Sequence, residues 1–378
     1  QVVSMRPSVL GDSEVRELVQ REGASATLSE LERGMLEGRH EHYVAYRHAK
    51  LGVRVAHFIH STALGRRNGF HALRAGGMRR HAREISELDV LRDGLNLSRA
   101  MSFKCAAAGI PFGGSKSSLT APAFRDLDER HLGFIAFAID QGQLMTGPDV
   151  GLEPELIDAL GRRTPHILCG PSRPLGTTSG PTAEGVLAAV RVALEQRFGS
   201  ANVQGRLVTI QGLGSVGLEL ARTNENGGAR VVAAARDAAR AAQAKAELPK
   251  LELVPPDELL RVPSDILCPC ALGRVLDRDS IAGLRTSLVY GAANNQLAAD
   301  STEEELTLAE LLASRGILFQ PDWTYTMGGI LAGFAVYQHR DLASFAQVKT
   351  DVLRAAGDGT RDLLREADRT GETPTQVA

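Results

Sequence analysis

One segment of the chain restricts the fold more than any other, because it joins an apolar strand, a glycine-rich turn and a helix in direct succession. The run LVTIQ leads into GLGSVG (212–217), and the helical pattern VGLELART follows. Short apolar runs then alternate with helical patterns as far as GILFQPDW. Strands that alternate with helices form a parallel sheet, since each crossover returns the chain to the same end of the sheet. The sequence therefore predicts a doubly wound α/β domain.

The GLGSVG turn has the features of a dinucleotide-binding fingerprint. A G-x-G-x-x-G pattern is informative only between a strand and a helix, and here it has that context. Gly212 permits a tight turn, Gly214 lets the backbone approach a pyrophosphate, and Gly217 lets the helix pack closely on the strand. Ser215 and Val216 begin the helix, whose unpaired N–H groups and positive end attract phosphate. We expect these residues to form the phosphate site of a dinucleotide.

The end of the next strand bears on which nicotinamide cofactor fits. An acidic residue about 20 residues after the glycines usually binds the adenosine ribose of NAD. Here the strand VVAAA ends in alanines and Arg236 follows. A guanidinium without a neighbouring carboxylate suits the 2′-phosphate of NADP. The sequence favours NADP, while Asp237 leaves NAD open if the strand ends later.

The stretch AGIPFGGSKSS (108–118) is one residue away from the pattern of a triphosphate-binding loop. Such a loop follows a strand and has its lysine directly after the second glycine. Here a helical pattern precedes the stretch, and Ser115 separates Gly114 from Lys116. Small residues around Lys116 and Lys104 allow the backbone to approach a ligand closely, and a lysine in such a place is partly desolvated, which lowers its pKa and makes it a usable base. We interpret this stretch as a catalytic site that Asp149, on the TGPDVG turn, can tune.

Charge and composition narrow the partners. The 378-residue chain has a formal net charge of −2, with its basic residues spread along its length, which argues against nucleic acid or an anionic membrane as the main partner. No apolar run reaches the roughly 18 residues that span a bilayer, and no signal-peptide core is evident. Four cysteines make no disulfide framework, and the Cys268–Cys270 pair has too few ligands for a zinc site. We expect a cytoplasmic protein without a metal.

Seven motifs resemble those of the Glu/Leu/Phe/Val amino acid dehydrogenases, in the same order and across nearly the whole chain from about residue 50 to 375. They are MSFKCAAAGIPFGGSK, TGPDVG, PTAEGV, GLGSVG, PCALG, GAANNQL and PDW followed by GG. The likeness is closer to the leucine and phenylalanine branch than to the glutamate enzymes. It implies NAD(P)-dependent, reversible conversion of an L-amino acid into its 2-oxo acid and ammonia, in a homo-oligomer.

The resemblance also implies two domains that close on each other during the reaction. The glycine- and proline-rich segment 169–182 marks a boundary. We expect residues 169–330 to form a Rossmann dinucleotide-binding domain. Residues 1–168 and 331–378 would form an α/β domain that binds the substrate and makes the oligomer.

Matching positions carry the family's site roles. Lys116 would be the general base that activates water, and Asp149 would exchange protons with the amino group. Lys104 would hold the substrate α-carboxylate. Thr182 would contact the nicotinamide amide, and Asn295 would reach the substrate or the nicotinamide ribose. The resemblance also places three further residues at the cofactor, namely Ala271, Ala293 and Asn294.

The residues expected around the substrate side chain argue against an acidic amino acid. Ala75 stands where the glutamate enzymes have a lysine, directly before the Gly76-Gly77 pair. The other matching pocket positions are Gly147, Ile330 and Gly333. The two glycines leave room for a bulky apolar or aromatic side chain.

Several departures from the family pattern leave other functions open. Ser115 and Ser117 flank Lys116, Thr326 replaces an asparagine, the loop at 65–75 is longer, and about 45 residues precede the shared region. These differences suggest specialised substrate recognition. One alternative is an imine- or amine-forming reductase of a biosynthetic pathway. Another is a non-catalytic regulatory paralogue, against which the retained Lys104, Lys116 and Asp149 argue.

Overall fold

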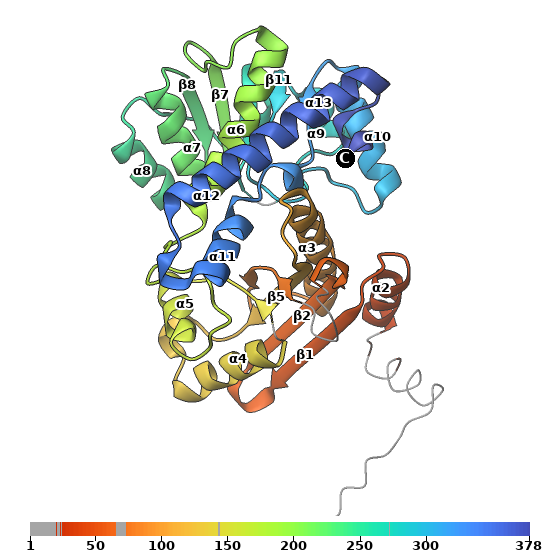
Figure 1. Ribbon diagram of the computed structural model, residues 1–378, viewed down its shortest axis with the longest axis vertical. Helices are drawn as coiled ribbons and strands as arrows, with labels where there is room; N and C mark the ends of the chain where they lie inside the picture. Colours follow the sequence, from red (N-terminus) through yellow and green to blue (C-terminus); the bar gives the residue numbers. More distant parts are fainter. Residues whose placement is uncertain (1–19, 21–22, 24, 66–72, 143, 272) are drawn as a thin grey trace, which may run out of the picture.

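Two six-stranded sheets organise the chain into two α/β lobes, which the computed structural model places one above the other (Figure 1). The structure describes residues 20, 23, 25–65, 73–142, 144–271 and 273–378. Most of the lengthened loop at 65–75 and much of the N-terminal extension therefore lie outside the described residues. Among the described residues, no helix combines the length and apolar character that crossing a membrane requires.

The upper sheet is fully parallel, as the alternation of strands and helices predicts. Its strands are β7 (Leu207–Gln211), β8 (Arg230–Ala234), β9 (Glu252–Leu253), β10 (Ser264–Pro269), β11 (Thr286–Val289) and β12 (Leu318–Phe319). They lie in the order β12-β11-β10-β7-β8-β9, and every pair is parallel. This is the Rossmann order, which reverses between β7 and β10. Ligands of open parallel sheets bind at that reversal, at the carboxyl ends of the strands.

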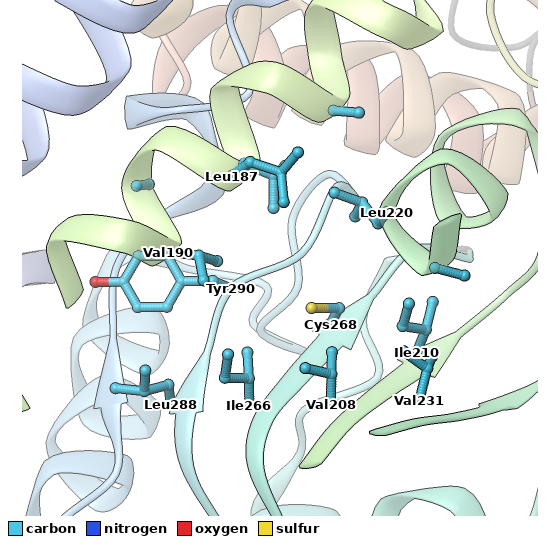
Figure 2. Packing of buried hydrophobic residues seen from close by; sticks show 14 of the residues in the cluster. Leu187, Val190, Val208, Ile210, Leu220, Val231, Ile266, Cys268, Leu288 and Tyr290 are labelled. Atoms are coloured by element: carbon cyan, nitrogen blue, oxygen red, sulfur yellow. The ribbon is translucent and has the colours of Figure 1, made fainter. Parts of the chain in front are cut away.

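Helices cover both faces of the upper sheet. They are α6 (Ser179–Phe198), α7 (Ser215–Asn226), α8 (Ala238–Glu247), α9 (Arg278–Gly283) and α10 (Thr302–Ser314). Figure 2 shows side chains from α6, α7 and four strands meeting in one layer. On β10 the alternation of side chains sends Ile266 and Cys268 into this layer and Leu267 to the opposite face, against α9 and α10. Burial on both faces explains why these strands are almost wholly apolar.

The lower sheet is mixed. Its strands are β1 (His42–His48), β2 (Val53–Ser61), β3 (Arg74–Ala75), β4 (Met78–Arg80), β5 (Gly113–Thr120) and β6 (Leu144–Met145). β1, β2 and β5 pair antiparallel, whereas β3 and β4 run parallel to β5. Lys116 lies inside β5 and not in a loop before a helix. The stretch AGIPFGGSKSS (108–118) is therefore not a triphosphate-binding loop.

Helix α3 (Glu87–Ala107) covers one face of the lower sheet, where Phe58 packs against Val90 and Leu91. Helices α4 (Glu129–Gly142) and α5 (Pro154–Gly161) cover the other face through a separate apolar cluster. α3 lies between the lower sheet and the upper lobe in Figure 1. It begins at the N-cap Ser86, whose side chain accepts the N–H of Asp89, and its last turn carries Lys104.

The C-terminal helices contact both lobes. In α11 (Gly328–His339), Phe334 and Tyr337 pack edge-on against Phe112, just before β5. α12 (Phe345–Val352) and α13 (Gly359–Thr370) then lie along α6 on the upper lobe (Figure 1), and α14 (Pro374–Val377) ends the chain. The segment 331–378 thus joins the lower lobe through α11 and the upper lobe through α13. The domain boundaries at 168/169 and 330/331 stay a prediction.

Candidate active site

A cleft of about 1890 Å³ lies between the lobes and collects residues from both. Every residue assigned to the site from the sequence lines this cleft except Gly217. Gly217 instead packs the start of α7 on the turn, where an added Cβ would lie only 2.0 Å from the carbonyl oxygen of Gly212. The fold therefore brings together positions that are up to about 250 residues apart in sequence.

Lys116 and Asp149 form an ion pair on the floor of the cleft. Lys116 Nζ contacts Asp149 Oδ2, and Asp149 Oδ1 accepts the N–H of Val150 at 2.7 Å. Gly77 leaves the space for this pair, since a Cβ there would lie 3.1 Å from the Cβ of Asp149. Burial by itself raises the pKa of Asp149, but the charges of Lys116 and Arg79 outweigh it and hold the pKa well below its usual range. Asp149 is thus ionised while it pairs with Lys116.

Ser115 and Ser117 do not belong to the cleft lining. Successive side chains of a strand point to opposite faces, so both serines point away from the face of Lys116. Ser117 Oγ lies 2.9 Å from Nδ1 of the buried His57, whose Nε2 lies 2.8 Å from the carbonyl oxygen of Ala138 in α4. Ser117 therefore provides a hydrogen-bond partner for a buried histidine on the face of the sheet that α4 covers.

Lys104 reaches across the cleft from the lower lobe. It is buried in the last turn of α3, and its Nζ donates to Oδ1 of Asn294 in the upper lobe at 2.6 Å. Burial lowers the pKa of Lys104, and the charge of Asp322 opposes that effect. The residue assigned to the substrate carboxylate and a residue assigned to the cofactor are thus direct neighbours.

Asp322 is a site residue that the sequence analysis did not single out. Burial raises its pKa to about 6, and its Oδ1 accepts the N–H of Asn295 at 2.9 Å. This bond supports Asn295 in a left-handed backbone conformation (φ 50°). The Asp322 carbonyl oxygen accepts the Thr326 hydroxyl at 2.8 Å. The substituted Thr326 therefore has a local partner in the turn that leads into α11.

The GLGSVG turn adopts the geometry that phosphate binding requires. Gly212 has φ 98°, a left-handed value that favours glycine, and a Cβ there would lie 2.9 Å from Ala271. Gly214 is the N-cap of α7 and has no side chain, so it cannot accept a hydrogen bond from the first N–H groups of the helix. Such a helix end fits a dinucleotide pyrophosphate.

The strand that follows this turn ends at Ala234, and Arg236 and Asp237 come directly after it. The Asp237 carboxylate caps α8 by accepting the N–H groups of Ala239 and Arg240 at 2.9 and 3.2 Å. Arg236 and Arg240 both line the cleft near the glycine turn.

The opposite end of the cleft has a small, apolar wall. Gly147 and Gly333 both lie next to Cys169. A Cβ added to Gly147 would lie 3.3 Å from Cys169 Cβ, and one added to Gly333 would lie 3.8 Å from Cys169 Sγ. Ala75 is buried nearby on β3, whose partner β6 leads to Gly147. Ile330 precedes Gly333 by one turn of α11. Cys169 lines the cleft but was not predicted as a site residue. In the sequence it only marks the start of the boundary segment 169–182, which gives no indication of a pocket.

Comparisons with known proteins agree with this arrangement, although no protein-family model matches the chain. L-tryptophan dehydrogenase of Nostoc punctiforme is 33% identical over 274 residues, covering 72% of this chain and 73% of that protein. Leucine dehydrogenase of Thermoactinomyces intermedius is 32% identical over 298 residues, 77% of each chain. The chain belongs to the Glu/Leu/Phe/Val amino acid dehydrogenase family. It is an NAD(P)-dependent oxidoreductase that acts on CH–NH2 groups.

Solved structures place this dehydrogenase within the same fold. The crystal structure of L-tryptophan dehydrogenase from Nostoc punctiforme has a TM-score of 0.65 at 27% identity, covering 89% of this chain and 93% of that one. A hetero-hexameric glutamate dehydrogenase from Thermus thermophilus has a TM-score of 0.68 at 22% identity, covering 93% and 92%. The second likeness concerns the fold alone.

Lys116→Ala should lower kcat by about 10²- to 10⁴-fold, because it removes the group assigned as the general base. Dinucleotide affinity should change little, as measured by quenching of Trp323, the single tryptophan, which packs on Phe103 beside the cleft. Lys349→Ala, which removes a surface lysine paired with Glu184, is the matched control and should keep full activity. Retained turnover in the Lys116 variant would refute its assignment.

Proposed function

We propose that this dehydrogenase interconverts a bulky apolar or aromatic L-amino acid with its 2-oxo acid and ammonia, with NADP(H) as the preferred cofactor. The observation that carries the proposal is the buried Lys116–Asp149 pair, placed between a dinucleotide turn and a small apolar wall. A lysine and a carboxylate in contact provide the base and the proton relay that reversible deamination needs.

In the proposed reaction, the substrate α-carboxylate displaces Asn294 from Lys104 and lies between the lobes. Asp149 accepts a proton from the substrate amino group. Once Cα has lost its hydride, Lys116 removes a proton from the water that attacks the resulting imine carbon, and it returns that proton as ammonia leaves. When bound at the glycine turn, the nicotinamide supplies the hydride acceptor at the substrate Cα.

The residues in place fit that cofactor. The Gly212 turn lets backbone approach closely, and the uncapped start of α7 favours a pyrophosphate. Thr182, whose hydroxyl donates to the carbonyl oxygen of Thr178 at 2.8 Å, lines the cleft beside Gly329. Its oxygen lone pairs suit the nicotinamide amide that the family resemblance assigns to it.

The wall around Cys169 supports the substrate class. Ala75 brings no cation to this end of the cleft, so a side-chain carboxylate would be buried without a partner. Gly147 and Gly333 add no side chain to this wall, which leaves more room in the cleft for a bulky ring. Sulfur next to an aromatic ring adds a favourable contact.

Gly333→Ala should narrow this wall without strain, because the new methyl group would lie 3.8 Å from Cys169 Sγ. We expect kcat/KM for aromatic 2-oxo acids to fall by about 5- to 150-fold, which corresponds to ~1–3 kcal/mol, while smaller aliphatic substrates are retained. A panel of 2-oxo acids with ammonium measures the ratio. Gly359→Ala in α13, where an added Cβ has open space, is the control. An equal loss with all substrates would contradict the proposed pocket.

The preference for NADP follows from the residues after β8. Asp237 uses its carboxylate to cap α8, so it is engaged away from a ribose, whereas Arg236 and Arg240 offer two guanidinium groups to a 2′-phosphate. Asp237 Oδ2 also lies 3.6 Å from Nε of Arg240 and offsets part of that charge, so Arg236 carries the preference for a phosphate over a ribose hydroxyl.

Arg236→Ala should raise the KM for NADPH by about tenfold or more and leave the KM for NADH nearly unchanged, since it removes one charged hydrogen bond to the 2′-phosphate. Arg230→Ala is the control, because it lies at the other end of β8 in a surface pair with Glu252. Equal effects on the two cofactors would argue for NAD.

Assembly and location complete the proposal. We infer a homo-oligomer built through the lower lobe, where β1 is an edge strand and Val44 and Phe137 are 39% and 50% exposed. The four cysteines are free, which suits the reducing cytoplasm. Light scattering of the purified chain should give a multiple of the 40.4 kDa mass, and a monomer would contradict the assembly.

A further inference from the structure

Arg79 contacts two carboxylates at the edge of the active site. Its Nη1 donates to Oδ1 of Asp93 at 2.7 Å, and its Nε lies 3.5 Å from Oδ2 of Asp149. That Asp149 oxygen is the one that contacts Lys116. The arginine side chain is 13% exposed, so water screens these charges only weakly.

The backbone fixes Arg79 and Asp149 relative to each other. β4 lies between β5 and the segment 147–150. The N–H of Met78 donates to the carbonyl oxygen of Gly147 at 2.9 Å, and the N–H of Arg80 donates to that of Val150 at 3.1 Å. Arg79 itself pairs with Ser118 on β5, two residues beyond Lys116. The two cations and the carboxylate therefore come from three neighbouring backbone segments of one sheet.

We propose that Arg79 is a positioning residue of the deamination reaction, which clamps Asp149 against Lys116 and is itself locked by Asp93. This inference rests on the proposed function and extends it. An arginine stays charged through the whole pH range of an enzyme, so it cannot exchange protons with the substrate. Its fixed charge keeps a negative partner in place while Lys116 gains and loses its proton.

The arrangement is also balanced in charge. Lys116 and Arg79 face Asp149 and Asp93, so two positive groups meet two negative ones. His81, from the end of β4, lies 3.6 Å from Asp93, and burial lowers its pKa, so that it adds little positive charge. Two cations stand further off, namely Lys104 on α3 and Arg54 on β2.

Opposite changes in this cluster should move the pH profile in opposite directions. Losing the positive charge in Arg79→Gln favours the protonated form of every neighbouring group. The acid limb of kcat/KM should therefore shift upward by about one pH unit, with a loss of about tenfold or more at neutral pH. Losing the negative charge in Asp93→Asn should shift the limb downward. Arg79→Lys keeps the charge and should restore the position of the limb without restoring the full rate.

Arg206→Gln is the matched control, because it removes a partly buried arginine that pairs with a carboxylate, Asp265, outside the cleft. It should leave the profile in place. Circular dichroism and thermal melting check that each variant folds.

A second readout needs no turnover. A small anhydride acylates only the neutral amine of Lys116, so the extent of acylation reports its protonation. Peptide mass spectrometry measures this extent at each pH, and the Lys116→Ala protein is the blank. The same opposite shifts in this labelling profile support the role of Arg79, and unshifted profiles in both variants overturn it. Absence of wild-type turnover with every 2-oxo acid overturns the proposed function instead.

Discussion

The ion pair between Lys116 and Asp149 is the interaction on which the rest of the site depends. Lys116 is buried and the side chain of Asp149 is 15% exposed, and burying a charge costs free energy that one partner only partly returns. Replacing such a pair by apolar residues often leaves a protein equally stable. Its presence therefore indicates chemistry. Gly77 leaves it room, Arg79 adds a second cation, and the N–H of Val150 occupies the other carboxylate oxygen.

This pair lies in the cleft between the lobes because each sheet presents its functional edge to the same cleft. In the upper lobe, the reversal of strand order between β7 and β10 leaves a crevice where Gly212 and Ala271 nearly touch. In the lower lobe, β5 and the last turn of α3 bring Lys116 and Lys104 to that crevice. The contact of Lys104 with Asn294 joins the lobes directly. A substrate carboxylate that takes over Lys104 must break this contact, which couples binding to the opening between the lobes.

The sequence predicted the architecture and most site positions because those features are local. A strand, a glycine turn and a helix in succession specify a Rossmann unit, and the motifs around Lys104, Lys116 and Asp149 point to one family. Lysine itself was a usable signal: the chain has six lysines, far fewer than its arginines, and two of them lie in the cleft. Roles that depend on long-range pairing were out of reach. Neither the partners of Arg79 nor the orientation of Ser117 toward His57 follows from spacing, since both depend on which strands become neighbours.

The central claim is that the Lys116–Asp149 pair performs a dehydrogenase reaction on a bulky substrate. The most direct measurement follows NADPH absorbance with an aromatic 2-oxo acid and ammonium, in the wild-type protein and in Asp149→Asn. We predict NADPH oxidation that requires both co-substrates, and a fall of about 10²- to 10⁴-fold in the variant with NADPH binding retained. Equal rates in the two proteins, or oxidation that does not need ammonium, would contradict the account.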